Sequence, residues 1–359
     1  MKLQTLKISH FRNLTNLSIS ADPSFNFISG SNGAGKTSVL EAIYCLGTAR
    51  SFRTTRNNLL IQNGFDKLNL FATFCDRLGK DHQVGLEKGN GSKRFRLDKS
   101  EVQRASEIAR LFPLQTFTPD SHALLDTGPL ARRRFLDWGL FHVEPDYLAV
   151  WQKYRKILSQ RNAALRNNQS RQSITVWNEP LASVGEQISN FRQQYCDQIS
   201  SHLDACLELF QLPYALNLEY RPGWSKNITL AQALENKIEF DLARAVTTSG
   251  PHRAELSLTI EKHPASSFLS RGESKAVAFS LQFCQMKLCA LLSGEMPVVI
   301  WDDVDAEFDE VRRSAFLQLL ADMDCQTFLT TTNFAGAVPN CVSSYKWFHV
   351  ERGDLKEMV

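Results

Sequence analysis

One short stretch constrains the fold of this chain more than any other feature of the sequence. Residues 30–37 read Gly-Ser-Asn-Gly-Ala-Gly-Lys-Thr and match the pattern G-x-x-x-x-G-K-[ST]. A short strand-like segment at 25–28, with three apolar residues of four, precedes the stretch, and apolar residues recur at helical spacing from 39 to 46 after it. A phosphate-binding loop needs this order of strand, glycine-rich loop and helix. The sequence therefore predicts a P-loop rather than a purely structural glycine turn.

The residue types of this loop suit the binding of a triphosphate. Glycines let backbone N–H groups approach phosphate oxygens without a clash from Cβ. We expect Lys36 to reach the β and γ phosphates and to take part in catalysis, and the Thr37 hydroxyl to ligate Mg²⁺. No Asn-Lys-x-Asp sequence, which reads guanine in GTPases, occurs in the chain, so ATP is favoured over GTP. The predicted ATP-binding residues of the loop are Gly30, Ser31, Asn32, Gly33, Ala34, Gly35, Lys36 and Thr37.

A second part of the same site is expected near the other end of the chain. The apolar run at 298–301 reads as a buried strand and is followed directly by Asp302 and Asp303. A P-loop needs an acid at the end of such a strand to hold Mg²⁺. We expect Asp302 to hold the metal and Asp303 to orient and polarise the attacking water, although two surface acids after a strand would look the same. The long separation of the two halves predicts a large insertion between them.

The middle of the chain supplies that insertion. Residues 65–100 read as antiparallel strands, and long helices are predicted near 145–166 and 178–211. The expected fold class is α/β, with a mixed sheet, an antiparallel β part and an inserted α-helical arm. The expected division is an ATPase lobe at 1–125, a helical arm or second lobe at 126–245, and a C-terminal ATPase part at 246–359.

Composition and the cysteines narrow the class of protein. No segment approaches about 18 uninterrupted apolar residues, and the N-terminal residues lack the pattern of a secretion signal. We therefore expect a cytoplasmic protein without a membrane partner. The eight cysteines form no CxxC pair and have no histidines at zinc-ligand spacing, so reduced and mostly buried thiols are expected.

A turn upstream of Asp302 is a further candidate. Residues 270–273 read Ser-Arg-Gly-Glu and start a predicted helix at about 272–292. A helix N-terminus with Ser270 and Gly272 exposed would be a second anion-binding end. An ordinary helix N-cap would have the same sequence.

The order of P-loop, Ser-x-Gly-Glu turn and Asp-Asp strand resembles the head domain of the SMC and Rad50 class of ABC-type ATPases. Further motifs, which span nearly the whole chain, are similar to those of the RecF family of DNA replication and repair proteins. They are Phe11-Arg12-Asn13-Leu14, Ser51-Phe52-Arg53-Thr54, Arg132-Arg133-Arg134-Phe135-Leu136-Asp137, Gly250-Pro251-His252-Arg253 and Asp302-Asp303-Val304. The resemblance implies a P-loop ABC-type ATPase head and adds Arg12 to the ATP-binding residues.

The resemblance also implies head-to-head dimerisation around ATP. Ser270, Gly272 and Glu273 of one subunit would then act in trans on the nucleotide held by the other. Two departures from the usual motifs of the family bear on how strongly the dimer would close. Glu273 stands where this family more often has Gln, and Ala-Glu-Phe-Asp at 306–309 replaces the usual Ser-Glu-Leu-Asp. The threonines at 330–332 could sense the γ-phosphate or simply end a strand.

Positive charge is concentrated in the helical arm. The formal net charge of +3 is too small to indicate a polyanion partner, so the distribution matters. No acidic residue lies between Asp146 and Glu179, a stretch rich in Lys and Arg. We expect a surface for DNA phosphates without base specificity, although the cations could instead pair with acids of the second helix. The candidate DNA-binding residues are Arg132, Arg133, Arg134, Lys153, Arg155, Lys156 and Arg161.

Two functional hypotheses follow. In the first, ATP closes a homodimer that grips double-stranded DNA and slow hydrolysis releases it. The resemblance implies a weak, DNA-stimulated ATPase that acts at gaps and duplex junctions with RecR and RecO, and helps to load RecA in recombinational repair and the SOS response. In the second, the protein is a non-catalytic adaptor in which ATP is a structural ligand and the arm binds protein partners. A transporter ATPase is less favoured because the arm is basic and no membrane partner sequence is present.

Overall fold

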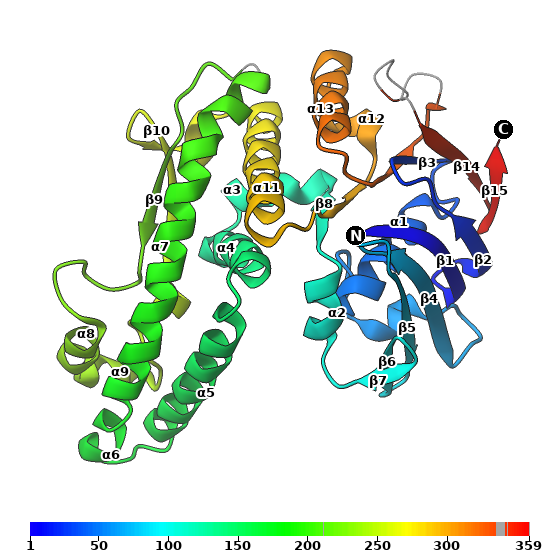
Figure 1. The fold of residues 1–359 in the computed structure, drawn as a ribbon. Coiled ribbons are helices and arrows are strands. Elements are labelled where there is room, and N and C mark those ends of the chain that lie inside the picture. Colours follow the sequence, from blue (N-terminus) through cyan, green and yellow to red (C-terminus); the bar gives the residue numbers. More distant parts are fainter. Residues whose placement is uncertain (211, 335–341, 343, 359) are drawn as a thin grey trace. The chain divides into compact units, whose positions relative to one another are not determined.

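The computed structural model describes residues 1–210, 212–334, 342 and 344–358, without the side chains of 306 and 307. These residues form two compact units, one made of Met1–Ser121 with Cys289–Val359 and the other of His122–Leu288. Figure 1 shows the elements of both units, coloured by their position in the sequence. The sequence predicts boundaries at 125 and 245. In the structure the stretch 246–288 belongs to the helical unit, since its strand β10 (Glu255–Ile260) pairs with β9 (Asn217–Arg221).

The first unit contains a six-stranded antiparallel sheet with the order β2-β1-β4-β5-β6-β7. Its central strands alternate buried and partly exposed residues, as expected for a sheet with one face on the core. The chain supplies these strands as one hairpin of β1 and β2 and a run of four consecutive antiparallel strands, β4 to β7. The strands are β1 (Lys2–Phe11), β2 (Leu14–Ser20), β4 (Lys67–Cys75), β5 (Asp81–Gly89), β6 (Lys93–Leu97) and β7 (Ser100–Val102).

A second six-stranded sheet, of order β15-β14-β3-β13-β12-β8, joins the two ends of the sequence. All its pairings are parallel except that of β15 with β14. In Figure 1 the blue β3 lies beside the red β14. Every residue of β3, β12 and β13 is buried, as is typical of parallel strands covered on both faces. The strands are β3 (Phe25–Ser29), β8 (Leu114–Phe117), β12 (Val298–Trp301), β13 (Thr327–Thr331), β14 (Tyr345–Glu351) and β15 (Asp354–Met358).

Helix α1 (Lys36–Thr48) joins the two sheets through one hydrophobic core. Leu70 of the first sheet, Ile43 of α1 and Ile300 of the second sheet belong to the same buried cluster. Packing on both sides fixes the start of α1, which follows the P-loop directly. The remaining elements of this unit are η1 (Asn57–Leu60), α2 (Ala105–Leu111), η2 (Pro119–His122), α12 (Val304–Glu307) and α13 (Glu310–Asp322).

The second unit is built on a long helical hairpin. Helices α5 (Tyr147–Arg166) and α7 (Asn178–Leu209) pack side by side and match the two helices expected from the sequence (Figure 1). At 1.5 Å per residue they extend over about 30 and 48 Å. The other elements are α3 (Ala123–Asp126), α4 (Pro129–Val143), α6 (Arg171–Thr175), α8 (Leu230–Asn236), α9 (Ile238–Arg244), η3 (Pro251–Arg253), β11 (His263–Pro264), α10 (Ala265–Phe268) and α11 (Arg271–Ser293).

Buried arginines tie this hairpin to segments that precede and follow it in the sequence. Arg161 of α5 is fully buried, and its Nη1 donates to Asp241 at 2.7 Å and to Thr247 at 2.8 Å. Arg192 of α7 is also fully buried, and it donates to Asp137 at 2.7 Å and to the Pro251 carbonyl at 2.8 Å. Buried charges need such partners, so these contacts hold the chain around 241–251 against the helices.

Helix α11 carries the Ser-x-Gly-Glu turn at its start. In the described part of the chain it is the one helix with the length and apolar composition to cross a membrane. However, 67% of its apolar window is buried inside the protein, as in the core helix of a folded unit.

His252, in the Gly-Pro-His-Arg motif, gives the helical unit a predicted dependence on pH. Its Nε2 lies 2.9 Å from the Thr247 carbonyl and must donate, so its Nδ1 accepts from the Tyr154 hydroxyl at 2.6 Å. Burial lowers the pKa of His252 to about 4. Because the folded-state pKa lies below that of the unfolded chain, the unfolded state binds the proton first as pH falls. Stability is therefore complete above about pH 6.5 and is lost towards pH 4.

We expect the free energy of unfolding to fall by about 2 kcal/mol between pH 7.5 and about pH 5 from this group alone. Urea unfolding of the wild type and of His252→Gln, followed by helical circular dichroism at both pH values, measures this change. The variant should have a smaller pH dependence, because it has no imidazole to protonate. An equal loss in both proteins would contradict the prediction.

Candidate nucleotide-binding site

A pocket of about 530 Å³ in the first unit collects residues from both ends of the sequence. Its walls come from the P-loop, the turn after β1, the segment after α1, and the ends of β12 and β13. The lining residues are Arg12, Asn13, Ser31, Asn32, Gly33, Gly35, Lys36, Thr37, Ser38, Arg53, Leu59, Ile61, Pro119, Asp302, Asp303 and Thr330. Of the predicted loop residues, all except Gly30 and Ala34 line this pocket.

Glycine is required at specific points of the loop. Gly30 and Gly35 have φ values of 150° and 123°, which residues with a side chain rarely adopt. A Cβ on Gly30 would lie 2.3 Å from the Val350 carbonyl oxygen, and one on Gly35 would lie 2.9 Å from Nδ2 of Asn13. The loop therefore takes this path only because these positions have no side chain.

The loop and the start of α1 form a cationic, donor-rich surface. Nζ of Lys36 donates to the carbonyls of Gly30 at 2.7 Å and Ser31 at 3.1 Å, which folds the lysine over the loop. Burial lowers the pKa of Lys36, and the nearby Asp303, Asp302 and Asp305 oppose that shift. The first turn of α1 contains no acid of its own, so the positive end of the helix adds to the cationic character of this surface. This surface is suited to bind an anion.

The acidic strand end meets the P-loop directly. Oγ1 of Thr37 donates to Oδ1 of Asp302 at 2.9 Å, across 265 residues of sequence. Asp302 is 9% exposed and Asp303, the next residue, has a left-handed backbone with φ 58° and ψ 60°. The structure thus brings Lys36, Thr37 and both aspartates into one pocket, as the sequence predicts for this pair of motifs. A hydroxyl and a carboxylate oxygen side by side form a donor set that fits Mg²⁺.

Thr330, at the end of β13, holds both aspartates in place. Its Oγ1 donates to Oδ1 of Asp302 at 2.7 Å and accepts the backbone N–H of Asp303 at 2.7 Å. The next two threonines instead bond Asp305, at 2.7 Å each. Sequence reasoning left Thr330 between a sensor and an ordinary strand end. Thr330 reaches both aspartates because β13 pairs with β12, and the sequence does not reveal this pairing.

The two arginines in the pocket share a partner that the sequence analysis missed. Arg12 has an expected place in the site, and Arg53 comes from the Ser-Phe-Arg-Thr motif. Both lie close to Glu41, a fully buried carboxylate in α1. An acidic residue inside an apolar helix pattern was the available signal.

The Ser-x-Gly-Glu turn lies in the second unit and forms a capping box at the start of α11. The Ser270 N–H donates to Glu273 Oε2 at 2.9 Å, and the Glu273 N–H lies 3.4 Å from Ser270 Oγ. A Cβ on Gly272 would meet nothing within 4 Å, so this face of the turn is open. The departure at 306–309 is only partly visible, because the side chains of 306 and 307 lie outside the described residues.

The candidate DNA-binding residues separate into paired and exposed groups. Arg161 is buried on Asp241, so the expectation that it contacts DNA is wrong. Arg132 pairs with Glu255 at 2.7 Å, and Arg133 donates to the Ala254 carbonyl at 2.8 Å. Spacing along a helix could not distinguish these positions from surface ones. The exposed cations, without an ion pair among the described residues, are Arg134, Lys153, Arg155 and Lys156.

Comparison with solved structures establishes the class of fold. One structure, described as "Structure of the recombination mediator protein RecF-ATP in RecFOR pathway", has a TM-score of 0.89 and 23% identity, over 100% of this chain and 98% of that one. An Smc head bound to the C-winged helix domain of ScpA has a TM-score of 0.64 and 14% identity, over 100% and 97%. The fold is that of a P-loop ABC-type ATPase head of the SMC kind, with an inserted helical arm.

Comparison of sequences narrows this class. The family described as "RecF/RecN/SMC N terminal domain" matches residues 2–355. The DNA replication and repair protein RecF of Shewanella frigidimarina is 38% identical over 355 residues, and these cover 98% of each chain. The RecF of Shewanella baltica is 37% identical with the same coverage. The chain belongs to the RecF family.

Replacing Thr330 by valine should destabilise the first unit. The change removes the acceptor of the partly buried Asp303 N–H and one donor to the buried Asp302, at a cost of about 1–3 kcal/mol in the free energy of unfolding. Denaturant unfolding of Thr330→Val measures the loss. Thr327→Val is the matched control in β13, because its hydroxyl makes only a 3.4 Å bond to the Cys325 carbonyl and a 3.8 Å contact to sulfur. Equal losses in both variants would contradict the assignment.

Proposed function

We propose that this protein is an ATPase that uses ATP and Mg²⁺ as a switch for holding double-stranded DNA in replication and recombinational repair. The observation that carries the proposal is the hydrogen bond between Thr37 and Asp302, which joins the P-loop to the acidic strand end. The names of the relatives, DNA replication and repair protein RecF, support the role in DNA metabolism.

The pocket residues divide the work of holding the nucleotide. Backbone N–H groups of the loop and the Lys36 ammonium would bind the phosphates, with Arg12 adding positive charge. Thr37 and Asp302 would hold Mg²⁺, which neutralises charge on the phosphates. Asp303 would accept a hydrogen bond from the attacking water and orient it in line with the γ-phosphate. The solved structure described as RecF-ATP supports the choice of nucleotide.

Leu59 and Ile61 give the pocket an apolar part that suits a base. Leu59 is 47% exposed although it lines the pocket, and such an exposed leucine could pack against a flat aromatic ring. Neither side chain can read the edge of a base by hydrogen bonding. Preference for adenine would therefore depend on other groups near this part of the pocket.

Closure of two heads on ATP is the second element of the proposal. Ser270, Gly272 and Glu273 would approach the γ-phosphate held by the partner subunit. The open Gly272 face and the positive end of α11 support this role. A dimer closed in this way favours ATP over ADP, so hydrolysis would open it.

DNA would contact the exposed cations of the arm. Lys153, Arg155 and Lys156 lie within one turn of α5 and are exposed. Such residues neutralise backbone phosphates without reading bases. In this proposal the protein acts at gaps and junctions with RecR and RecO and helps to load RecA, and the solved structure of similar fold is described as belonging to a RecFOR pathway.

Sedimentation with ATP and duplex DNA should separate a switch from an adaptor. The wild type should dimerise on DNA and return to monomer as ATP is consumed, Lys36→Arg should stay monomeric, and Asp303→Asn should remain dimeric longer. The reason is that Lys36 is needed to bind the phosphates, whereas Asp303 is needed only for hydrolysis. An adaptor with a structural ATP would give the same lifetime on DNA for the wild type and Asp303→Asn, and that result would contradict the switch.

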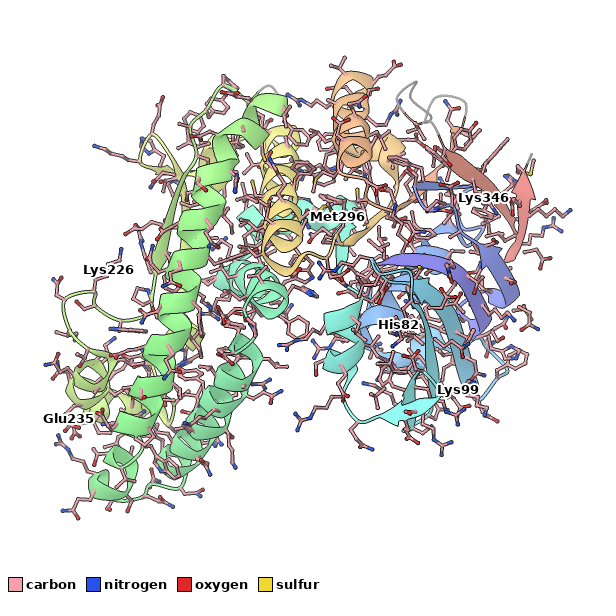
Figure 2. The ribbon with its side chains drawn as sticks, in the orientation of Figure 1. His82, Lys99, Lys226, Glu235, Met296 and Lys346 are labelled. Carbon is pink, nitrogen blue, oxygen red and sulfur yellow. The ribbon has the colours of Figure 1, made fainter. Side chains whose placement is uncertain are left out.

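The salt dependence of DNA binding should identify the surface. Replacing Lys153 and Lys156 together by Gln should lower the slope of log K against log salt by roughly 0.9 for each phosphate that is no longer neutralised. Arg171→Gln is the matched control, because Arg171 already pairs with Glu235 at 2.6 Å and with Glu239 at 3.4 Å. Figure 2 labels Glu235, which lies on α8 of the helical unit. Fluorescence anisotropy at several salt concentrations measures the slopes. An unchanged slope in the double variant would contradict the proposal that α5 contacts DNA.

A further inference from the structure

Glu41 is a buried carboxylate that lies beside the nucleotide pocket without lining it. Its side chain is fully buried in α1, the helix that follows the P-loop. Arg12 binds it through two atoms, with Nε at 2.9 Å from Oε2 and Nη2 at 2.7 Å from Oε1. This two-point geometry fixes the plane of the guanidinium as well as its position.

The same carboxylate also holds the segment that carries Arg53. Ser51 donates its hydroxyl to Oε1 of Glu41, and the same Ser51 oxygen accepts the backbone N–H groups of Arg53 and Thr54, both at 2.9 Å. Nη1 of Arg53 lies 3.8 Å from Oε2 of Glu41. Glu41 therefore ties two sequence motifs, which begin at Phe11 and Ser51, to the helix of the P-loop.

Both arginines keep part of their binding capacity. Arg12 uses Nε and Nη2 on Glu41, and its Nη1 has no hydrogen bond within the described parts of the chain. Arg53 is 49% exposed and touches Glu41 only through the longer contact, so it remains able to move towards a ligand. Both side chains line the pocket. With one carboxylate between two guanidinium groups, the cluster keeps a net positive charge beside an expected anion site.

Stability alone is a poor explanation for this arrangement. Removing a carboxylate from water is costly, and a buried ion pair often contributes no more than apolar residues of the same size would. A carboxylate that fixes two cations at the wall of an anion pocket has a different benefit, because cations that are already in place lose less freedom when the ligand binds.

We propose that Glu41 is a positioning residue that sets nucleotide affinity through Arg12 and Arg53 without touching the nucleotide. The inference rests on the proposed binding of ATP in this pocket. In Glu41→Gln the side chain keeps its size, but an amide NH₂ replaces one oxygen and faces the N–H groups of Arg12. The arginine loses one of its two bonds and becomes free to rotate away from the pocket.

The test measures binding of a fluorescent methylanthraniloyl derivative of ATP, with Mg²⁺, to the full-length protein. Glu41→Gln should weaken binding by roughly tenfold or more, the effect expected when a charge-assisted hydrogen bond is removed. In a background that already carries Arg12→Ala and Arg53→Ala, the same substitution should change the affinity by less than about twofold, because its effect passes through those side chains. A purely structural role would give the same loss in both backgrounds.

Matched variants separate positioning from stability. Ile43→Val lies in α1, is fully buried and should lower stability without changing affinity. Ser51→Ala is the second test of the positioning role of Glu41. It frees the Arg53 segment without removing the buried charge, and it should also weaken binding. If Glu41→Gln does not fold, the affinity of Ser51→Ala alone tests the positioning role. Wild-type affinity in both Glu41→Gln and Ser51→Ala would overturn the positioning role alone. Equal losses from Glu41→Gln in the wild-type and double-variant backgrounds would overturn it as well. Failure of the wild type to bind the analogue would overturn the proposed function, and the positioning role with it.

Discussion

The parallel pairing of β3 with β13, and of β13 with β12, is the constraint on which the rest of the structure depends. Parallel strands end at the same edge of a sheet, so the P-loop after β3 and the aspartates after β12 emerge side by side. Thr330, at the end of the intervening strand β13, bonds both aspartates. A site that binds a triphosphate and a metal thus arises from sheet order rather than from closeness in sequence.

Polar side chains around this edge connect the pocket to the body of the unit. Glu41 links the P-loop helix to the segments that carry Arg12 and Arg53, and Asp305 accepts from the threonines that follow Thr330. The contacts to Glu41 satisfy a fully buried carboxylate that would be costly to leave unpaired. The wall of the pocket is therefore rigid where backbone and carboxylates form it, and more adjustable at Arg53, which is half exposed.

The helical arm shows which features the sequence pattern can predict and which it cannot. The lengths of α5 and α7 follow from apolar periodicity and a polar connection, and the sequence predicts both. The same periodicity does not tell a surface arginine from one that ends on a buried carboxylate. Arg161 and Arg192 are both fully buried on acids from distant segments, whereas Lys153 and Lys156 are exposed. Pairing across long sequence separations decides which charges remain free for a polyanion.

The sequence by itself determined the P-loop, the acidic strand end, the long helical pair and the resemblance to the RecF family, because each depends on spacing within a short window. The tertiary structure alone decided that Thr330 bridges the aspartates, that Glu41 anchors the arginines, and that residues 246–288 pack with the arm. These outcomes depend on strand order and on which buried polar groups meet. Local periodicity carries no record of either, since the partners come from parts of the chain that lie far apart in the sequence.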